Sequence, residues 1–456
     1  MRYWRIGLMF FLAVLQLTAC QKDYMITETK KSVEEKKDET KENEVKKWKQ
    51  ERASKESIKT NLEKLGGMVR SYKSSSKETS INYIKEVFQN YGYDIEMQKF
   101  SIKRPDTLSA MNENTPEDMF NIVTESRESL GEGENIIVKH PENIKGRKTV
   151  YITAHYDTTD KTIGVIDNGT GVAVVLEAAK ELRQLESNIN VVFVLFDAEE
   201  VSQQGAKNFV YHLSTEEKEN AIGCINIDMV GETGAGELVM KFGNGEHNIL
   251  SVLWKHILKK DIAVEMGVLT DEQAFYYGRI PGVTIENHNP DFSLERSENQ
   301  FQYIDYEQLL GLTNDIINFI RNFDLDFYNR ALEEKIEVES DIERICEIKN
   351  AVFKKAVAKV VENGFIMETC FYYETDDKRE FQMILKNKKF FDIKEPDDFV
   401  QISDGEKSIR YKIKEMDGGQ AQATFVNEQY SGTIKGNIDR IRCMQIIEDF
   451  YEAEYW

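Results

Sequence analysis

Three short runs of apolar residues constrain the fold of this 456-residue chain more than any other feature. The runs are Val150–Ala154, Asn190–Phe196 and Ala221–Ile227, and their composition is typical of β-strands. The second run is continuously apolar, which is typical of a strand buried on both faces. Helical periodicity follows the first run, from Val172 to Leu182. Strands that alternate with helices predict an α/β fold, here a three-layer αβα sandwich around a mixed, mostly parallel sheet.

Residues of the types that commonly bind metal ions follow each of these runs. His155 comes directly after the first run, Glu199 and Glu200 come shortly after the second, and Asp228 follows the third. Asp167 lies in the polar loop after His155. In an open α/β sheet, ligands bind at the carboxyl ends of the strands. Acidic side chains gathered there repel one another without a cation, so this edge predicts a site for divalent metal ions.

Two further observations extend this prediction. A run at Val283–Glu286 is expected to be the last strand of the sheet, and His288 follows it. Glu199 and Glu200 are adjacent, and in extended chain their side chains would point to opposite faces. One of them can then bind a metal ion while its neighbour acts on bound water. Taken singly, each of these residues has an ordinary alternative role as a helix cap or an exposed polar group, and only their number argues for a metal site.

The motifs HYD, DNGTG, DAEE and NIDMVG, followed by a late histidine, resemble the co-catalytic two-zinc aminopeptidase family. That family also includes glutamate carboxypeptidase and the transferrin receptor. The resemblance covers roughly residues 60–322. It implies a zinc-dependent exopeptidase that removes N-terminal residues from peptides, with a peptide as substrate and two zinc ions as cofactors.

By position, the resemblance also implies roles for single residues. The two zinc ions would be held by His155, Asp167, Glu200, Asp228 and His288. Asp167 would bridge the ions, with His155 and Asp228 on one ion and Glu200 and His288 on the other. Glu199 would be the general base, and Asp157 would orient His155. The resemblance further implies a cis peptide bond between Asp167 and Asn168, and it places Asp271 near the substrate cleft.

The chain departs from the family pattern around His288, where the common H-T-x-x-D spacing is absent, and residues 103–133 form an apparently irregular insertion. Two alternative functions follow from the same scaffold. Glutaminyl cyclases share the fold with one zinc ion but do not keep the first histidine, so His155 argues against that function. A non-catalytic binding protein, in the manner of the transferrin receptor, would be expected to have lost metal ligands.

The first 20 residues resemble the signal peptide of a bacterial lipoprotein. Arg2 and Arg5 precede the apolar stretch Ile6–Leu17, and the sequence LTAC ends at Cys20. This pattern predicts lipidation of Cys20 and a lipid-anchored protein of the bacterial cell envelope, outside the cytoplasm; an ordinary signal peptide is the alternative. Residues 21–55 are dominated by Lys and Glu and predict a charged tether.

The sequence changes in character after about residue 330. A charged segment, Leu332–Val361, predicts a long helix; strand-like runs follow, and a last helix is expected at Ile438–Tyr451. We therefore expect a zinc aminopeptidase-like domain at residues 56–325 and a small α+β domain at residues 330–456. The net charge of −21 argues against nucleic acid as a partner, since phosphate binding requires a basic face.

Overall fold

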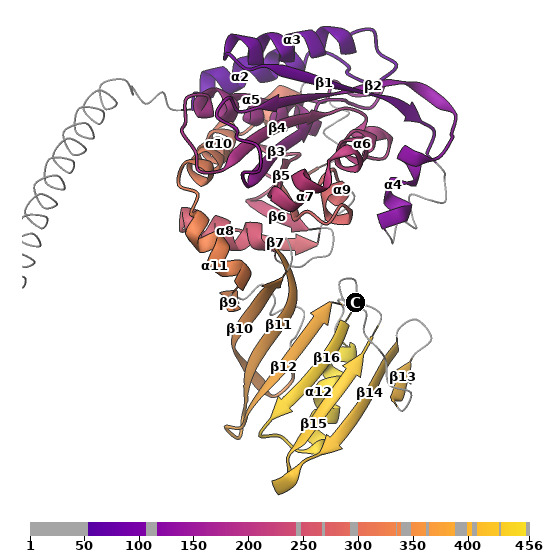
Figure 1. Cartoon of the computed structure of the whole chain (residues 1–456), viewed down its shortest axis with the longest axis vertical. Helices are drawn as coiled ribbons and strands as arrows, with labels where there is room; N and C mark the ends of the chain where they lie inside the picture. Colours follow the sequence, from indigo (N-terminus) through magenta and orange to yellow (C-terminus); the bar gives the residue numbers. More distant parts are fainter. Residues whose placement is uncertain are drawn as a thin grey trace, which may run out of the picture. The chain divides into compact units, whose positions relative to one another are not determined.

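The computed structural model describes residues 53–105, 116–242, 248–266, 270–291, 300–333, 335–338, 348–361, 364–387, 399–403, 408–427 and 430–452. They contain two eight-stranded sheets (Figure 1). The predicted signal peptide, Cys20 and nearly all of the predicted tether lie outside the described residues. Among the helices that the structure describes, none has both the length and the apolar character needed to cross a bilayer.

The first sheet has the strand order β1-β2-β4-β3-β5-β8-β6-β7. Its strands are β1 Ile95–Lys103, β2 Ser129–Lys139, β3 Thr149–His155, β4 Asn190–Phe196, β5 Ala221–Ile227, β6 Leu238–Phe242, β7 Ala263–Met266 and β8 Gly282–Asn287. The central strands β4, β3, β5 and β8 are parallel to one another, whereas β2 is antiparallel to β4 and β6 is antiparallel to β8. These four central strands are buried along their whole length. The sheet is therefore mixed with a parallel centre, as predicted.

Helices cover both faces of this sheet (Figure 1). One face packs against α2 Lys55–Leu65, α3 Lys77–Asn90, α5 Thr170–Leu182, α8 Ile249–Leu258 and α10 Tyr306–Arg321. The other face carries α4 Pro116–Thr124, α6 Gln204–His212, α7 Thr215–Asn220 and α9 Glu272–Tyr277. Alternate residues of β3 divide between the two faces, with Ile152 in the first core and Tyr151 in the second. This arrangement is the predicted three-layer sandwich.

The second sheet is antiparallel throughout and has the order β13-β14-β15-β16-β12-β11-β10-β9. Its strands are β9 Lys335–Val338, β10 Ala351–Val361, β11 Phe365–Thr375, β12 Glu380–Asn387, β13 Val400–Ser403, β14 Ser408–Glu415, β15 Ala421–Val426 and β16 Tyr430–Gly436. Helix α12, Arg440–Glu452, packs against β14 and β15. A separate sheet with its own helix agrees with the predicted α+β character of this part of the chain.

The predicted helix at Leu332–Val361 is wrong. Helix α11 spans Leu325–Glu333, and the chain then forms β9 and, later, β10. Besides three lysines, β10 contains only valine, alanine and one phenylalanine, and the strand pairs with β11 along almost its whole length. This cross-strand pairing outweighs the helix preference of the charged residues, because strand propensity depends on the partner strand more than on composition.

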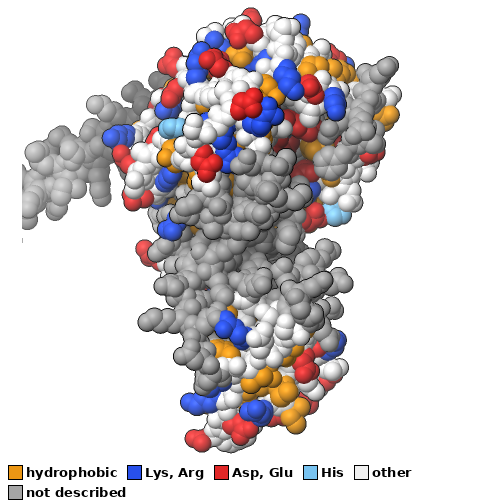
Figure 2. Space-filling view, turned by 90° about the vertical axis from the view of Figure 1, so that its right-hand side faces the viewer, with side chains coloured by type: hydrophobic (Ala, Val, Ile, Leu, Met, Phe, Trp, Pro, Cys, Tyr) orange, Lys and Arg blue, Asp and Glu red, His pale blue; other side chains and the backbone are white. Residues whose placement is uncertain are grey.

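The insertion at residues 103–133 is less irregular than its sequence suggests. It contains α4, and β2 already begins at Ser129, where it pairs with the end of β1. The side chain of Gln204 holds the backbone of Lys103, since it accepts from the Lys103 N–H at 2.8 Å and donates to the Lys103 carbonyl at 2.7 Å. Figure 2 shows acidic and basic side chains intermixed on the first-sheet region, so the negative net charge is not gathered in one patch of that face.

Candidate metal centre

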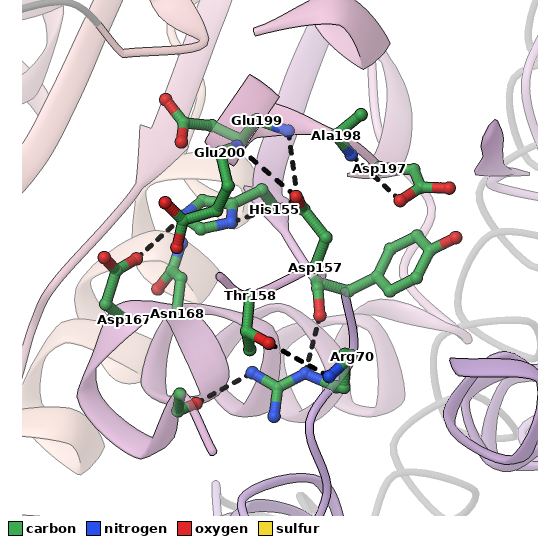
Figure 3. A network of polar contacts seen from close by, with 12 residues as sticks. Arg70, His155, Asp157, Thr158, Asp167, Asn168, Asp197, Ala198, Glu199 and Glu200 are labelled. Carbon is green, nitrogen blue, oxygen red and sulfur yellow. Dashed lines mark hydrogen bonds and ion pairs between the residues drawn. The ribbon is translucent and has the colours of Figure 1, made fainter. Parts of the chain in front are cut away.

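The centre of the site is His155, the last residue of β3, whose side chain is almost completely buried. Its Nε2 atom lies 3.0 Å from Oδ1 of Asp167 and 3.4 Å from Oδ1 of Asp228 (Figure 3 shows the first pair). Donor atoms of these three residues all lie within 4.8 Å of one another. A tetrahedral zinc ion with ligands at 2.0–2.2 Å separates its ligand atoms by about 3.4 Å. The three side chains that the sequence predicts as ligands therefore fit one zinc ion.

Asp157 connects His155 to the loop that carries the two glutamates. Its Oδ1 atom lies 3.4 Å from Nδ1 of His155, on the side of the ring opposite the other two carboxylates. The same carboxylate accepts hydrogen bonds from the backbone N–H groups of Glu199 (3.0 Å) and Glu200 (3.3 Å; Figure 3). One side chain thus orients both the imidazole and the glutamate loop, which supports the orienting role predicted for it.

Glu199 and Glu200 lie in a short 3-10 turn, Glu199–Val201, and not in extended chain as expected. The turn is entered through Ala198, whose φ of 57° is left-handed. Successive residues of a 3-10 helix point about 120° apart, so the two carboxylates still diverge. Glu200 lies beside His155 and Asp167 (Figure 3), and its Oε1 atom accepts from the Thr159 N–H at 3.2 Å.

Asp197 fixes the start of this turn, although the sequence analysis did not identify it. It is completely buried, accepts hydrogen bonds from the N–H groups of Ala198 (2.9 Å) and Glu134 (2.8 Å), and forms a 2.5 Å ion pair with Lys77 of α3. Burial raises the pKa of Asp197 to about 6, although Lys77 counteracts this shift. Its partner is far away in the sequence, so no local pattern points to it.

Asp167 is held next to Asp228 by its neighbour Asn168. The Asp167–Asn168 peptide bond is cis, which confirms the prediction. The buried Asn168 side chain donates to the carbonyl of Ile227 at 2.8 Å and accepts from the N–H of Gly171 at 3.0 Å. Ile227 directly precedes Asp228, so one amide side chain links the end of β5 to the loop that carries Asp167.

The charges of the site favour a cation. Burial alone lowers the pKa of His155, but Asp228, Asp157 and Asp167 together raise it well above its ordinary value. Burial, opposed by His155, raises the pKa of Asp228. Burial also raises the pKa of Glu199 well above its ordinary value; His155 opposes this shift, and the surrounding carboxylates add to it. Acids packed in this way are stabilised by a positive charge, and a divalent ion supplies it.

Two residues outside the predicted ligand set complete the surroundings. Asp271 precedes α9 and is fully buried, and within the described part of the chain neither of its carboxylate oxygens has a hydrogen-bond partner. Burial, and next Glu199, raise its pKa well above the ordinary value, which indicates that it lies near the site. Arg70 is also fully buried, and its charge acts on Asp157, Asp167 and Glu200.

The structure does not bring His288 into the group around His155. The His288 side chain is 49% exposed, and its Nδ1 atom is ion-paired with Glu265 of β7. The backbone explains this position: after β8, the N–H groups of His288 and Asn289 donate to the carbonyls of Glu237 and Ala235. Pairing with this neighbouring loop turns the histidine toward Glu265, and its role as a zinc ligand remains a prediction.

Comparison with known proteins links this region to a peptidase family. Residues 135–320 match the sequence model of peptidase family M28. The matched segment contains all the predicted ligands and Glu199, whereas Arg70 and Lys77 lie before it.

Two known proteins are similar in sequence to part of this chain. Aminopeptidase YwaD of Bacillus subtilis is 40% identical over 118 residues, which are 25% of this chain and 26% of that protein. An aminopeptidase of Pseudomonas aeruginosa is 29% identical over 129 residues, which are 27% of this chain and 23% of that protein. The chain thus spans about a quarter of the length of either relative.

Solved structures support the fold. The crystal structure of BSAP, a zinc aminopeptidase from Bacillus subtilis, superposes with a TM-score of 0.51 and 18% identity, covering 59% of this chain and 95% of that one. An aminopeptidase from Aneurinibacillus sp. strain AM-1 gives a TM-score of 0.50 at 18% identity, covering 59% of this chain and 93% of that one. The αβα architecture is therefore that of zinc aminopeptidases.

Proposed function

We propose that the protein is a zinc-dependent aminopeptidase that hydrolyses N-terminal residues from peptides. The observation that carries this proposal is the group formed by His155, Asp167 and Asp228, with Glu199 in the adjoining turn. The match to the M28 family model supports it, as do the two similar proteins that are named aminopeptidases. The buried imidazole also argues against a glutaminyl cyclase, in which the first histidine is not expected.

The residues of the chain divide the chemical work between them. Zinc, when bound, supplies a Lewis acid that polarises a carbonyl group and lowers the pKa of water. Glu199 is placed to take a proton from the attacking water and to return it to the leaving amine. Asp157 holds the backbone of Glu199 and the ring of His155 in one arrangement. The excess of carboxylates attracts the positively charged amino end of a peptide.

We propose two zinc ions bridged by Asp167. His155 and Asp228 would complete the first position, and Glu200 belongs to the second. For His288 to join the second position, its ring would have to exchange Glu265 for the metal.

The substitution Glu199→Gln tests the proposed function. It should lower kcat by ~10²–10⁴-fold, because general-base catalysis contributes that factor, while zinc content is kept. The matched control is Glu307→Gln on the surface of α10, which should leave both quantities unchanged. If the Glu199→Gln variant were as active as the wild type, Glu199 would not be the general base, although the protein would still be a peptidase.

A substrate panel separates the alternative functions. An aminopeptidase should cleave free peptides and leave amino-blocked peptides intact. A glutaminyl cyclase would release ammonia from peptides with N-terminal glutamine without cleaving them. A binding protein would hydrolyse no peptide even when zinc is supplied.

We further propose that the chain is a lipoprotein of the bacterial cell envelope, anchored to a membrane through Cys20, with residues 21–55 as a tether. This proposal rests on the signal-like sequence and on the charged composition that follows it. Residues 56–325 would form the catalytic domain and residues 330–456 the α+β domain. Cys20→Ser should release the protein from membranes or stop its maturation, and unchanged attachment would contradict the anchor.

A further inference from the structure

Arg70 is a charged residue whose position calls for an explanation. It lies between α2 and α3, outside the M28 segment, and its side chain has no exposed surface. Removing a guanidinium group from water costs several kcal/mol, and such a group persists only where hydrogen bonds replace those to water. The contacts of Arg70 show what replaces them.

The Arg70 guanidinium donates to five backbone carbonyl groups. Nε donates to Tyr156 at 2.6 Å, and Nη2 donates to Gly164 at 2.7 Å. Nη1 is shared by the carbonyls of Leu65 (2.8 Å), Ile163 (2.8 Å) and Met68 (3.2 Å). Only arginine offers five N–H donors in a fixed fork, whereas lysine offers three, so the site is built for a guanidinium.

Three of these carbonyls, those of Tyr156, Ile163 and Gly164, belong to the single loop that joins His155 to the turn with Asp167. Tyr156 stands between His155 and Asp157 at its start, and Gly164 lies three residues before Asp167 at its end. The backbone N–H of Arg70 also donates to Oγ1 of Thr158 at 2.9 Å (Figure 3). One residue therefore holds both ends of this loop.

Gly164 shows how closely the end of this loop packs against Arg70. Its φ of +57° is left-handed, and a Cβ atom there would lie 2.8 Å from Nη2 of Arg70 and 2.4 Å from the carbonyl oxygen of Asp167. Its own carbonyl oxygen also accepts from the Gly169 N–H at 3.1 Å, which closes the turn that contains Asp167. Movement of Arg70 would therefore disturb this turn.

The charge of Arg70 acts on carboxylates of this loop region and of the turn that carries Glu200. Burial lowers its pKa to about 10, and Asp157, Asp167 and Glu200 oppose this shift, so the group stays charged at neutral pH. The guanidinium thus offsets part of the repulsion between carboxylates of two different loops.

We propose that Arg70 is a positioning residue for the metal centre: it fixes the two ends of the loop between His155 and Asp167, so that these two residues share one zinc ion. Arg70 binds neither the metal nor the substrate, because all of its guanidinium donors are directed at backbone carbonyls. This inference rests on the zinc site proposed above.

The experiment is a zinc titration of folded apo-protein against a chromophoric chelator. We compare the wild type with Arg70→Lys, which keeps the charge and loses donors, and with Arg70→Met. The matched control is Arg183→Lys, since Nε of Arg183 also donates to a backbone carbonyl, that of Gly92, away from the site. Arg70→Lys should raise the zinc Kd about 10–100-fold, in the range of losses seen when residues supporting metal ligands are changed. The control should keep the wild-type Kd.

The outcomes separate positioning from a purely structural role. At saturating zinc, kcat of Arg70→Lys should fall with little change in KM. A lowered unfolding temperature with an unchanged zinc Kd would overturn the proposal, because Arg70 would then stabilise the fold alone. A wild-type protein that binds no zinc would refute the proposed function instead.

A second pair of variants covers the case in which the Arg70 variants do not fold. Thr158→Val removes the oxygen that accepts the Arg70 N–H at nearly constant volume, and Thr158→Ser keeps it. Weaker zinc binding by the valine variant than by the serine variant would support the proposal, and equal binding by the two would overturn it.

Discussion

Two neighbouring layers of buried side chains cross β3 and β5, one at the carboxyl ends of the strands and one two residues earlier, and they differ in how their hydrogen bonds are satisfied. His155 and Asp228 form an outer layer, and Thr153 and Asn226 form an inner layer on the same face, since side chains alternate along a strand. Thr153 lies opposite Asn226, which in turn lies opposite Thr284 of β8. Both layers are polar and buried.

The inner layer is a continuous chain of hydrogen bonds, in which Oε1 of Glu272 alone lacks a partner among the described residues. Thr153 donates to Oδ1 of Asn226 at 2.9 Å, and Nδ2 of Asn226 donates to Thr284 at 3.2 Å. Thr284 donates in turn to Oε2 of Glu272 at 3.2 Å, and Thr270 donates to the same oxygen. Each donor meets an acceptor, so this layer holds three strands and α9 together without a ligand.

In the outer layer, by contrast, hydrogen bonds within the protein leave polar atoms unsatisfied. Within the described residues, Nδ1 of His155 and Oδ1 of Asp228 have only ion-pair contacts at 3.4 Å and no hydrogen bond, and carboxylates surround a single imidazole. Buried polar residues are therefore not in themselves a sign of function. The surplus of acceptors over donors marks the layer that needs a metal ion.

The largest expected difference between the layers concerns Asp228→Asn. The substitution removes a ligand, so zinc affinity should fall by more than the roughly 100-fold seen for supporting residues. The metal-free variant should nevertheless unfold at a higher temperature than metal-free wild type, because a desolvated carboxylate has been neutralised. Zinc titration and thermal unfolding in chelator measure both effects. Undiminished zinc binding would contradict the assignment of the outer layer.

A smaller effect is expected from Asn226→Ala in the inner layer. Unlike Asp228→Asn, which should stabilise the metal-free protein, this substitution should destabilise it. The change removes the acceptor of the Thr153 hydroxyl and one of the hydrogen bonds of Thr284, which should lower the free energy of unfolding by about 2 kcal/mol. Denaturant unfolding measures the loss. The exposed Asn82→Ala on α3 is the control and should stay within about 0.5 kcal/mol of the wild type. A neutral result for Asn226→Ala would mean that the inner layer does not hold the strands.

The last expected effect concerns Glu272 and the pH dependence of stability. Burial raises the pKa of Glu272 from an ordinary 4.5 to about 8, although Thr270 and Thr284 oppose the shift. Between these values the folded protein binds the proton more strongly than the unfolded chain, so stability falls as pH rises through this window. The slope from this group approaches about 1.4 kcal/mol per pH unit. Glu272→Gln should unfold with a flatter dependence over roughly pH 5–8, and equal slopes for both proteins would place the ionisation elsewhere.

The sequence was most informative where local chemistry and strand order coincide. The core strands, α5 and the group of His155, Asp167 and Asp228 were predicted, because apolar runs define parallel strands and their carboxyl ends meet at one edge. The cis bond before Asn168 followed from the family resemblance and not from spacing.

Features that depend on distant contacts were missed. Arg70 and Lys77 look like ordinary surface charges in the sequence, and only the fold pairs them with loops far along the chain. The strand β10 was predicted as a helix, since its pairing with β11 cannot be read from its own charges. His288 was placed by its position after β8, whereas the contacts of that loop turn it toward Glu265.

The hydrogen bonds of Arg70 also constrain the order of events during folding. Its acceptors at Tyr156 and Gly164 lie 86 and 94 residues further along the chain. A ribosome adding about 5–20 residues per second needs roughly 5–20 s to cover that distance. Throughout this interval the guanidinium keeps part of its water, because the carbonyls of Tyr156, Ile163 and Gly164 do not yet exist. If Arg70 positions the metal centre as proposed, the zinc site therefore takes its final form only after the chain has been made beyond Gly164.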